Sequence, residues 1–199
     1  MPCSARPAVQ NDAAQNGNPM RTFIALNLPQ PAVLALTRLQ EHLPVGRPVP
    51  PENLHLTLAF LDDQPDTLIG DLHLALQGLR APGFDLELAG LGTFGGRDPR
   101  VIFVSASGGE PMAHLHAAIR STLRAGGLTL GRERFRPHVT LARLRPGLPR
   151  ADLTRLAGWL TNEGGFRLPP FPVDHFALYR SILRSDHALH EELARYPLG

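Results

Sequence analysis

The chain contains no lysine, because all twenty of its basic residues are arginine. A ligase that consumes ATP needs a lysine to carry the adenylyl group, and Schiff-base chemistry needs an amine. A Walker-type nucleotide loop likewise needs its lysine on the phosphates. The composition therefore excludes these three kinds of reaction.

Cysteine and long apolar runs are also scarce. Cys3 is the one cysteine, which excludes a disulfide within the chain and a cysteine-based metal site. No stretch approaches the roughly 20 apolar residues of a membrane span, and residues 1–19 lack the apolar core of a signal peptide. We expect a cytoplasmic protein without membrane association. We also expect a disordered leader over residues 1–19 and a single domain over residues 20–199.

One five-residue phrase occurs twice. His55-Leu56-Thr57-Leu58-Ala59 is followed 83 residues later by His138-Val139-Thr140-Leu141-Ala142. With this composition, a histidine followed by x-Thr-Leu-Ala arises by chance roughly 0.009 times per chain. Two copies therefore point to a shared structural or chemical role.

Each copy alternates as a strand does. The histidine and the threonine two positions later share one face, about 7 Å apart, while the intervening apolar residues share the other. An imidazole with a pKa near 6.5 donates or accepts a proton close to neutrality. Two such strands facing each other can supply one general acid and one general base, and their threonines can hold a phosphate.

These segments resemble a known family. Residues 51–61 and 135–143, which contain the two copies, are similar to the two signature segments of the 2H phosphoesterase superfamily. Within it, they most resemble the RNA 2′,3′-cyclic phosphodiesterases, historically called 2′-5′ RNA ligases. The likeness extends to an opening strand at 21–29 and a closing segment at 178–181, and so covers roughly residues 20–198.

The resemblance implies an activity and partners. It implies hydrolysis of RNA ends that carry a 2′,3′-cyclic phosphate, leaving a 2′-phosphate, with His55 as proton donor and His138 as proton acceptor. Thr57 and Thr140 would bind the nonbridging phosphate oxygens. Any joining of RNA ends would reverse a transesterification without ATP. We expect a monomer with no cofactor and no metal.

Arginine is concentrated around the second copy, at positions 132, 134, 136, 143 and 145. Arg143 follows His138 by five residues, where the family places an arginine that contacts the substrate. In a regular strand this odd offset faces away from the histidine, so a bulge, a strand end or a bent side chain is needed. Phe135 and Arg136 are candidate RNA contacts. Aromatic side chains that could stack on a base are Phe60, Phe94, Phe135 and Tyr179.

Periodicity predicts the order of elements. We expect strands at 23–26, 54–60, 84–88, 101–104, 138–144, 173–179 and 187–197, and helices at 31–43, 66–80, 111–125 and 150–161. Glycines 90, 92, 95 and 96 predict a turn. The two sets of elements, each with one motif, predict an α+β fold. Two pseudo-symmetric lobes with antiparallel sheets would line a central cleft, with helices outside.

The remaining histidines predict no metal site. His114 and His116 are two apart in a predicted helix and so face different sides. His73, His175, His187 and His190 are interpreted as structural. Two rival functions stay open, namely a 2H enzyme acting on 2′-5′ oligoadenylate or a small cyclic nucleotide, and a noncatalytic module that binds RNA ends.

Overall fold

The computed structural model describes residues 19–131, 134–183 and 188–199. Its helices are α1 (Gln30–Glu41), α2 (Asp66–Gln77), α3 (Gly109–Ala125) and α4 (Arg150–Asn162), with a 3₁₀ turn η1 (Pro51–Asn53). Its strands are β1 (Met20–Asn27), β2 (Arg47–Pro48), β3 (His55–Gln64), β4 (Phe84–Phe94), β5 (Val101–Ser107), β6 (His138–Arg143), β7 (Phe171–Val173), β8 (His175–Leu183) and β9 (Ala188–Pro197).

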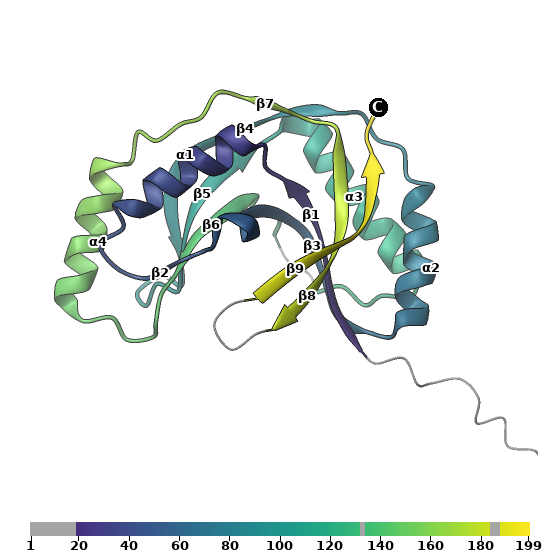
Figure 1. Ribbon diagram of the computed structural model, residues 1–199, viewed down its shortest axis with the longest axis horizontal. Coiled ribbons are helices and arrows are strands. Elements are labelled where there is room, and N and C mark those ends of the chain that lie inside the picture. The colour runs from purple at the N-terminus through teal and green to yellow at the C-terminus, as the bar shows by residue number, and fades with distance from the viewer. Residues whose placement is uncertain (1–18, 132–133, 184–187) are drawn as a thin grey trace, which may run out of the picture.

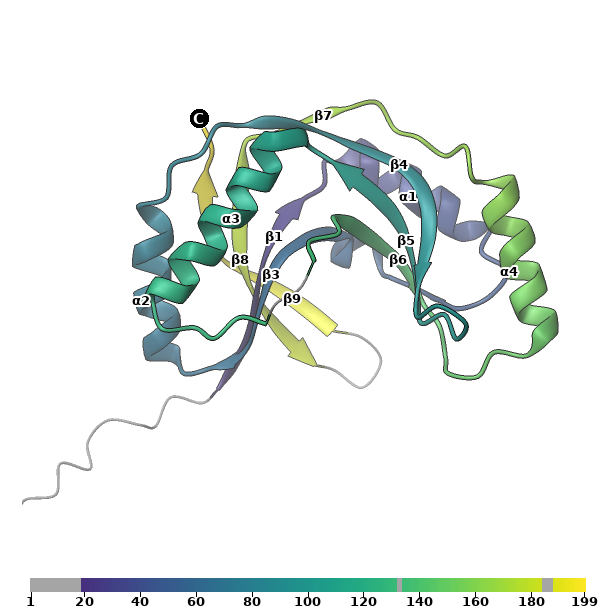
Figure 2. The ribbon, with the colours of Figure 1, turned by 180° about the vertical axis from the view of Figure 1, so that it is seen from behind.

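The described strands form one curled antiparallel sheet in the order β7-β4-β5-β6-β3-β1-β8-β9, with β2 beside β6. Helices α2 and α3 lie along one half of the sheet, and α1 and α4 lie by the other (Figures 1 and 2). The predicted α+β class, with antiparallel strands and outer helices, is confirmed. The two lobes do not have separate sheets, because β3 and β6 pair and make the sheet continuous. None of the described helices is long and apolar enough to cross a membrane.

Apolar periodicity accounts for how the elements pack. Helix α3 buries Met112, Leu115, Ile119 and Leu123, which recur at the three- and four-residue spacing of one helix face. Strand β1 instead buries every residue from Thr22 to Leu26. It lies between β3 and β8 in the sheet, so both of its faces are covered. The core thus extends across the middle of the sheet, beneath the two motif strands.

Strand β6 contains a bulge immediately after its motif threonine. Ile102 of β5 pairs with Ala142, and the next residue, Phe103, pairs with Thr140, so Leu141 is the extra residue. Leu141 and Ala142 are consecutive and both fully buried, which interrupts the alternation. The bulge returns Arg143 to the face that carries His138 and Thr140. It thereby resolves the odd five-residue offset.

Strand β3 repeats this bulge at the equivalent point. Ile24 of β1 pairs with Ala59 and Ala25 pairs with Thr57, so Leu58 is the extra residue. The Leu-Ala pair that ends both copies of the motif is therefore the bulge itself. This bulge places Phe60 on the same face of β3 as His55, just as the bulge in β6 places Arg143 on the face of His138. The Phe60 side chain is 60% exposed.

All predicted helices and strands occur, and several of them differ in extent. Strand β4 continues through Gly90 and Gly92, where the glycine pattern predicts a turn. A register shift lies between Leu88 and Leu91, and Gly90 has φ +77°. A Cβ at Gly92 would approach the Phe103 ring to 2.7 Å, so glycine is needed for close packing there. The short β2 and η1 were not predicted, since they lie among prolines.

The other differences concern the end regions of the chain. The strand predicted at 173–179 is two strands, β7 and β8, separated at Asp174. The predicted leader lies outside the described residues except for Pro19, as does His187 at the start of the last predicted strand. Strand β9 is otherwise present and pairs with β8 along most of its length.

Candidate active site

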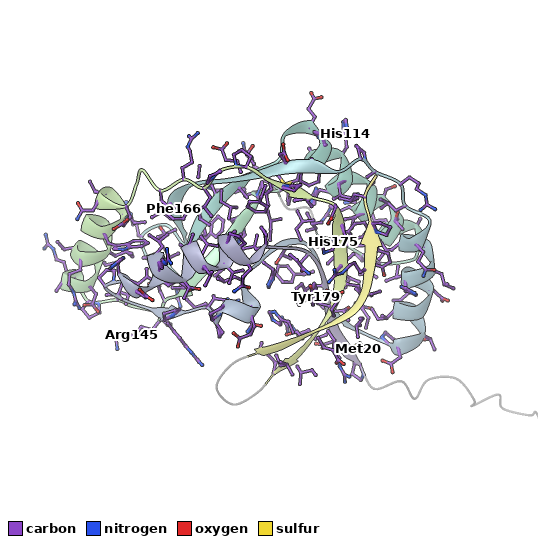
Figure 3. The ribbon with its side chains drawn as sticks, turned by 45° about the horizontal axis from the view of Figure 1, so that its top comes forward. Met20, His114, Arg145, Phe166, His175 and Tyr179 are labelled. Carbon is purple, nitrogen blue, oxygen red and sulfur yellow. The ribbon has the colours of Figure 1, made fainter. Side chains whose placement is uncertain are left out.

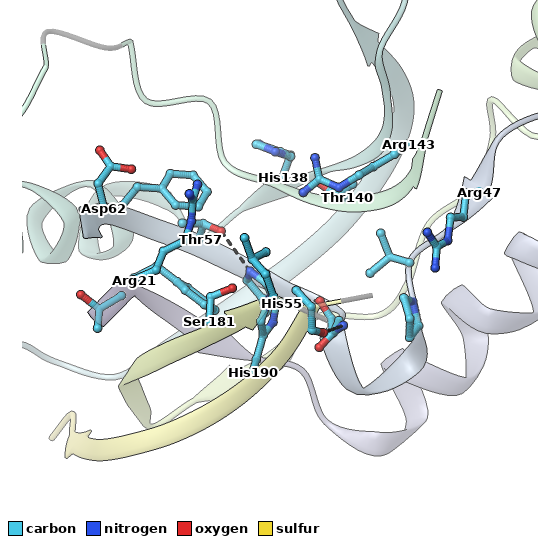
Figure 4. Close-up of a pocket in the computed structure, with 18 of the residues that line it drawn as sticks. Arg21, Arg47, His55, Thr57, Asp62, His138, Thr140, Arg143, Ser181 and His190 are labelled. Atoms are coloured by element: carbon cyan, nitrogen blue, oxygen red, sulfur yellow. Dashed lines mark hydrogen bonds between the residues drawn. The ribbon is translucent and has the colours of Figure 1, made fainter. Parts of the chain in front are cut away.

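The two motifs meet where β3 and β6 pair. The single paired position is Leu56 with Val139, in antiparallel orientation. This orientation directs His55 toward Thr140 and Thr57 toward His138, all on the face opposite the buried Leu56 and Val139. All four side chains line one cavity of about 460 Å³, hereafter the cleft (Figure 4). The sheet thus unites the two copies into one cluster.

Both motif histidines are held in the same tautomer. His55 Nδ1 lies 2.8 Å from the carbonyl oxygen of Asn53, and His138 Nδ1 lies 2.7 Å from that of Arg136. A carbonyl oxygen only accepts, so each Nδ1 carries the hydrogen. In the neutral rings, Nε2 then has the free lone pair. At His55 this nitrogen accepts from the Thr57 hydroxyl at 3.1 Å.

Buried phenylalanines hold the two imidazole rings. Phe23 of β1 stacks on His55 with ring centroids 4.9 Å apart, and Tyr179 of β8 in turn stacks on Phe23 at 5.2 Å. On β5, Phe103 meets His138 edge-on at 5.4 Å and is itself stacked on Phe94 of β4 at 4.2 Å. Each histidine therefore sits against two aromatic layers, which restrict its rotation.

Electrostatics keep His55 neutral in the free protein. Burial is the main cause that lowers its pKa, to about 4, and Coulomb repulsion from His190, Arg143 and His138 contributes. The hydrogen bond to the Asn53 carbonyl opposes this shift. An imidazole with this pKa is unprotonated at neutral pH. At neutral pH it therefore gains a proton when negative charge enters the cleft.

We expect His55 to make the protein less stable in mild acid. Above about pH 6.5 it is neutral in both states, but between about pH 6.5 and 4 the unfolded chain binds a proton that the folded chain excludes. As the pH decreases through this window, the free energy of unfolding should therefore decrease as well. This group should account for a loss of about 2 kcal/mol between pH 7 and pH 5. Urea unfolding of wild type and His55→Ala at both pH values measures it. An equal loss in both proteins would contradict the assignment.

Arg143 and Arg47 lie side by side in the cleft wall. Arg47 of β2 pairs with Arg143 of β6 in the antiparallel register, and both side chains are exposed and line the cleft. Like charges directly opposite each other are destabilising. This pair is accordingly suited to an anion between the guanidinium groups. Arg143 was expected here, but nothing in the sequence indicated Arg47.

The turn before Arg47 needs a glycine for β2 to lie this close to β6. Gly46 has φ +98°, and a Cβ there would lie 2.8 Å from a Leu144 methyl group and 3.2 Å from the Arg143 carbonyl oxygen. The turn is therefore restricted to a residue without a side chain. The glycine allows β2 to reach the motif strand.

His190 is a third histidine in the cleft. It pairs with Ser181 across β8 and β9, and its ring lies edge-on to His55 at 5.1 Å and to Phe23 at 4.8 Å. Burial, followed by the charge of Arg143, lowers its pKa. We had interpreted it as structural. Only the β8–β9 register brings it to His55, and no motif around it signals this position.

The candidate RNA contacts lie next to the cleft in a second cavity of about 490 Å³, hereafter the second hollow. Phe135 stacks face to face on His116 at 3.7 Å, so one side of its ring is covered. The Arg136 guanidinium lies 5.0 Å above the ring centre of Phe94. Of the four aromatic candidates, Phe60 lines both cavities and is the most exposed.

The Tyr179 side chain packs within the protein and its hydroxyl is hydrogen-bonded. Its single hydroxyl hydrogen is shared between two acceptors, Asn27 Oδ1 and Glu192 Oε2, and burial raises the pKa of Tyr179 to about 12. In Figure 3 the Tyr179 side chain lies within the molecule.

The two histidines of α3 lie apart from each other. His114 projects outward from the helix in Figure 3. His114 is exposed and His116 is turned toward Phe135, which confirms that they do not face one another. Among the described residues, no three histidine, cysteine or acidic side chains are placed to hold a metal ion.

Comparisons with known proteins agree with this geometry. The chain is 32% identical to the RNA 2′,3′-cyclic phosphodiesterase of Thermus thermophilus over 90% of both chains. It is 33% identical to the Escherichia coli protein of the same name, over 63% of this chain and 72% of that one. The crystal structure of Escherichia coli LigT with 3′-AMP superposes with a TM-score of 0.71 and 27% identity, covering 90% of this chain and 98% of LigT. The sequence model of the 2′-5′ RNA ligase superfamily matches residues 28–183, and the chain belongs to this superfamily.

Proposed function

We propose that this protein is an RNA 2′,3′-cyclic phosphodiesterase that opens a terminal cyclic phosphate to a 2′-phosphomonoester. The observation that carries the proposal is the meeting of two identically held histidines and two threonines in one cleft. Hydrolysis of a cyclic phosphate needs a base on one side of phosphorus and an acid on the other. The names of the relatives support the same substrate.

His138 is proposed as the base. Its Nδ1 hydrogen is engaged by the Arg136 carbonyl, so the lone pair of Nε2 is available to a water molecule. As the water oxygen attacks phosphorus, its proton passes to Nε2. The bond from phosphorus to the 3′ oxygen then breaks on the opposite side.

His55 is proposed as the acid for the departing 3′ oxygen. Its low pKa in the free protein means that it must first take up a proton. A phosphate anion close to the ring favours the protonated form and raises the pKa. Binding of the substrate can therefore charge His55, whose Nε2 hydrogen is then delivered to the 3′ oxygen. Thr57, released from His55 Nε2, becomes free to donate to the phosphate.

Thr57 and Thr140 are proposed to hold the nonbridging oxygens as negative charge increases on them. Arg143 is proposed to bind the same phosphate from the other end of the cleft, with its neighbour Arg47. None of these roles needs ATP or a metal. If a 5′-hydroxyl replaces water as the nucleophile, the same groups form a 2′-5′ linkage, so reversible ligation stays a prediction.

The test uses a short RNA that ends in a 2′,3′-cyclic phosphate, incubated with the purified protein in EDTA without ATP. We expect complete conversion to a 2′-phosphate end, resolved by chromatography and by phosphorus NMR. Binding of the RNA without conversion would contradict the proposal and favour a noncatalytic module. Turnover of 2′-5′ oligoadenylate or a small cyclic nucleotide alone would identify a different 2H substrate. A cytoplasmic location and a monomeric state also stay predictions.

A further inference from the structure

The second hollow opens onto the same motif cluster as the cleft. It shares four lining residues with the cleft: Thr57, Phe60, Asp62 and His138. His55 and Thr140 line only the cleft. Since Thr57 is directed toward His138, these two side chains form one edge of the cluster, and the second hollow begins there. A molecule reacting at the histidines can therefore extend into it.

Arginines from separate segments surround the second hollow. Arg120 comes from α3, and Arg134 and Arg136 come from the segment before β6. Arg120 Nη2 donates to the Gly131 carbonyl, which fixes its side chain at the wall. Arg134 and Arg136 are exposed. Asp62 is the one carboxylate among the described lining residues, so the lining carries a surplus of positive charge.

The arginines of the second hollow are not needed to hold the cyclic phosphate. That phosphate has the two threonines, Arg143 and Arg47 in the cleft. Burial and the charge of Arg120 lower the pKa of His116, so this ring adds no positive charge at neutral pH. The remaining positive charge is on guanidinium groups, which bind phosphate oxygens in pairs. A groove with arginines beside an exposed aromatic ring, here Phe60, is typical of sites that follow a single RNA strand.

We propose that the second hollow binds the sugar-phosphate backbone of the substrate strand, over the nucleotides that precede the terminal cyclic phosphate. A cyclic phosphate ends the strand, so the strand continues from the cleft only in the 5′ direction. The nucleotides of the strand, and not the terminal nucleotide alone, would then contribute to binding. This inference rests on the proposed function and specifies its substrate.

The test compares two substrates that differ only in the strand. One is a nucleoside 2′,3′-cyclic phosphate, and the other is a short RNA that ends in the same nucleotide. For Arg120→Gln/Arg134→Gln, we expect kcat/KM for the RNA to fall by about tenfold, while that for the mononucleotide stays within about twofold. The slope of log kcat/KM against log salt concentration should become shallower for the RNA by about 1.4, or about 0.7 for each lost phosphate contact.

A charge-matched control is Arg38→Gln/Arg145→Gln. Both of its side chains are exposed and line neither cavity, and Arg145 points away from the molecule (Figure 3). This control variant should leave kcat/KM unchanged for both substrates. Equal losses on both substrates in Arg120→Gln/Arg134→Gln would overturn the inference, because the lost charges would then act on the reacting phosphate and not on the strand. Unchanged turnover of the RNA would overturn it as well.

Failure of the proposed function has a different signature. If the wild type hydrolyses neither substrate, the function is wrong, and the inference is then decided by binding alone. Fluorescence anisotropy with a short RNA that ends in a 2′-phosphate measures this binding. An affinity about tenfold weaker for Arg120→Gln/Arg134→Gln than for the control variant supports the strand site. Equal affinities would overturn it.

Discussion

Substitution of His138 by alanine should lower kcat for opening a 2′,3′-cyclic phosphate by about 10²- to 10⁴-fold, the usual contribution of a positioned acid or base. His55→Ala should lower it by a similar factor. The affinity for RNA should change little, because the arginines and threonines that bind phosphate stay in place. Rapid-quench single-turnover assays measure the chemical step, and equilibrium binding to a 2′-phosphate-ended RNA measures affinity.

The pH profiles of the two variants distinguish the acid from the base. A base must be unprotonated, so its loss removes the limb on which kcat rises with pH. An acid must be protonated, so its loss removes the limb on which kcat falls with pH. We expect His138→Ala to lose the rising limb and His55→Ala the falling limb. The opposite pattern would exchange the two roles, in keeping with the low pKa of His55 in the free protein.

The control for both variants is His114→Ala. His114 is exposed on the outer side of α3, so its loss should leave kcat unchanged. A variant of either motif histidine that kept more than about a tenth of wild-type kcat would not fit acid–base catalysis by that residue.

Removal of the motif hydroxyls should produce the second large effect. Thr140→Val should lower kcat by about 10²- to 10³-fold, as expected when one donor to a developing oxyanion is lost. Thr57→Val should do the same. Valine keeps the β-branched shape of threonine, so the backbone of each motif strand is retained. Steady-state kinetics with the cyclic phosphate RNA measure both losses.

The two hydroxyls should differ in their effect on His55. In the free protein, the Thr57 hydroxyl donates to Nε2 of His55, and this bond exists only while the ring is neutral. Its loss in Thr57→Val should raise the pKa of His55, because a bond to the neutral form disfavours the charged form. Thr140→Val should leave that pKa unchanged. NMR titration of the imidazole carbons distinguishes the two, with Thr154→Val on α4 as the control. Equal pKa values in both variants would contradict this role of Thr57.

Local alternation in the sequence was sufficient to predict the motif strands. The pattern of His55 and Thr57 around buried Leu56, and its repeat at His138, depends only on the two-residue period of a strand. The helices were predicted for a similar reason, since a 3.6-residue apolar period needs no tertiary information. The residues that carry the proposed chemistry were therefore evident before the fold was known.

The face of Arg143 needed the neighbouring strand. The sequence of one strand does not show whether residues five apart share a face, because this depends on whether a bulge lies between them. A bulge is defined by the pairing with a neighbouring strand. The structure shows that the partner, β5, pairs with both Thr140 and Ala142 and leaves Leu141 unpaired. The Leu-Ala ending of both motifs is a signal that could have been used, since two consecutive apolar residues interrupt the alternation.

Nothing in the sequence indicated Arg47 or His190, and the sequence indicated the second hollow only through the cluster of Arg134, Phe135 and Arg136. Arg47 lies 96 residues from its partner Arg143, and His190 lies 135 residues from His55. Their positions depend on the pairing of β2 with β6 and of β9 with β8, together with a glycine turn at Gly46. No local period encodes such distant pairing.

By itself, the sequence determined the chemical groups, the strands that present them and the absence of lysine-dependent chemistry, because these follow from residue identity and short-range periodicity. Only the tertiary structure decided which charges surround those groups. Burial and the approach of His190, Arg143 and His138 lower the pKa of His55. These effects depend on distances through space, and distant segments acquire such distances only when the sheet closes around them.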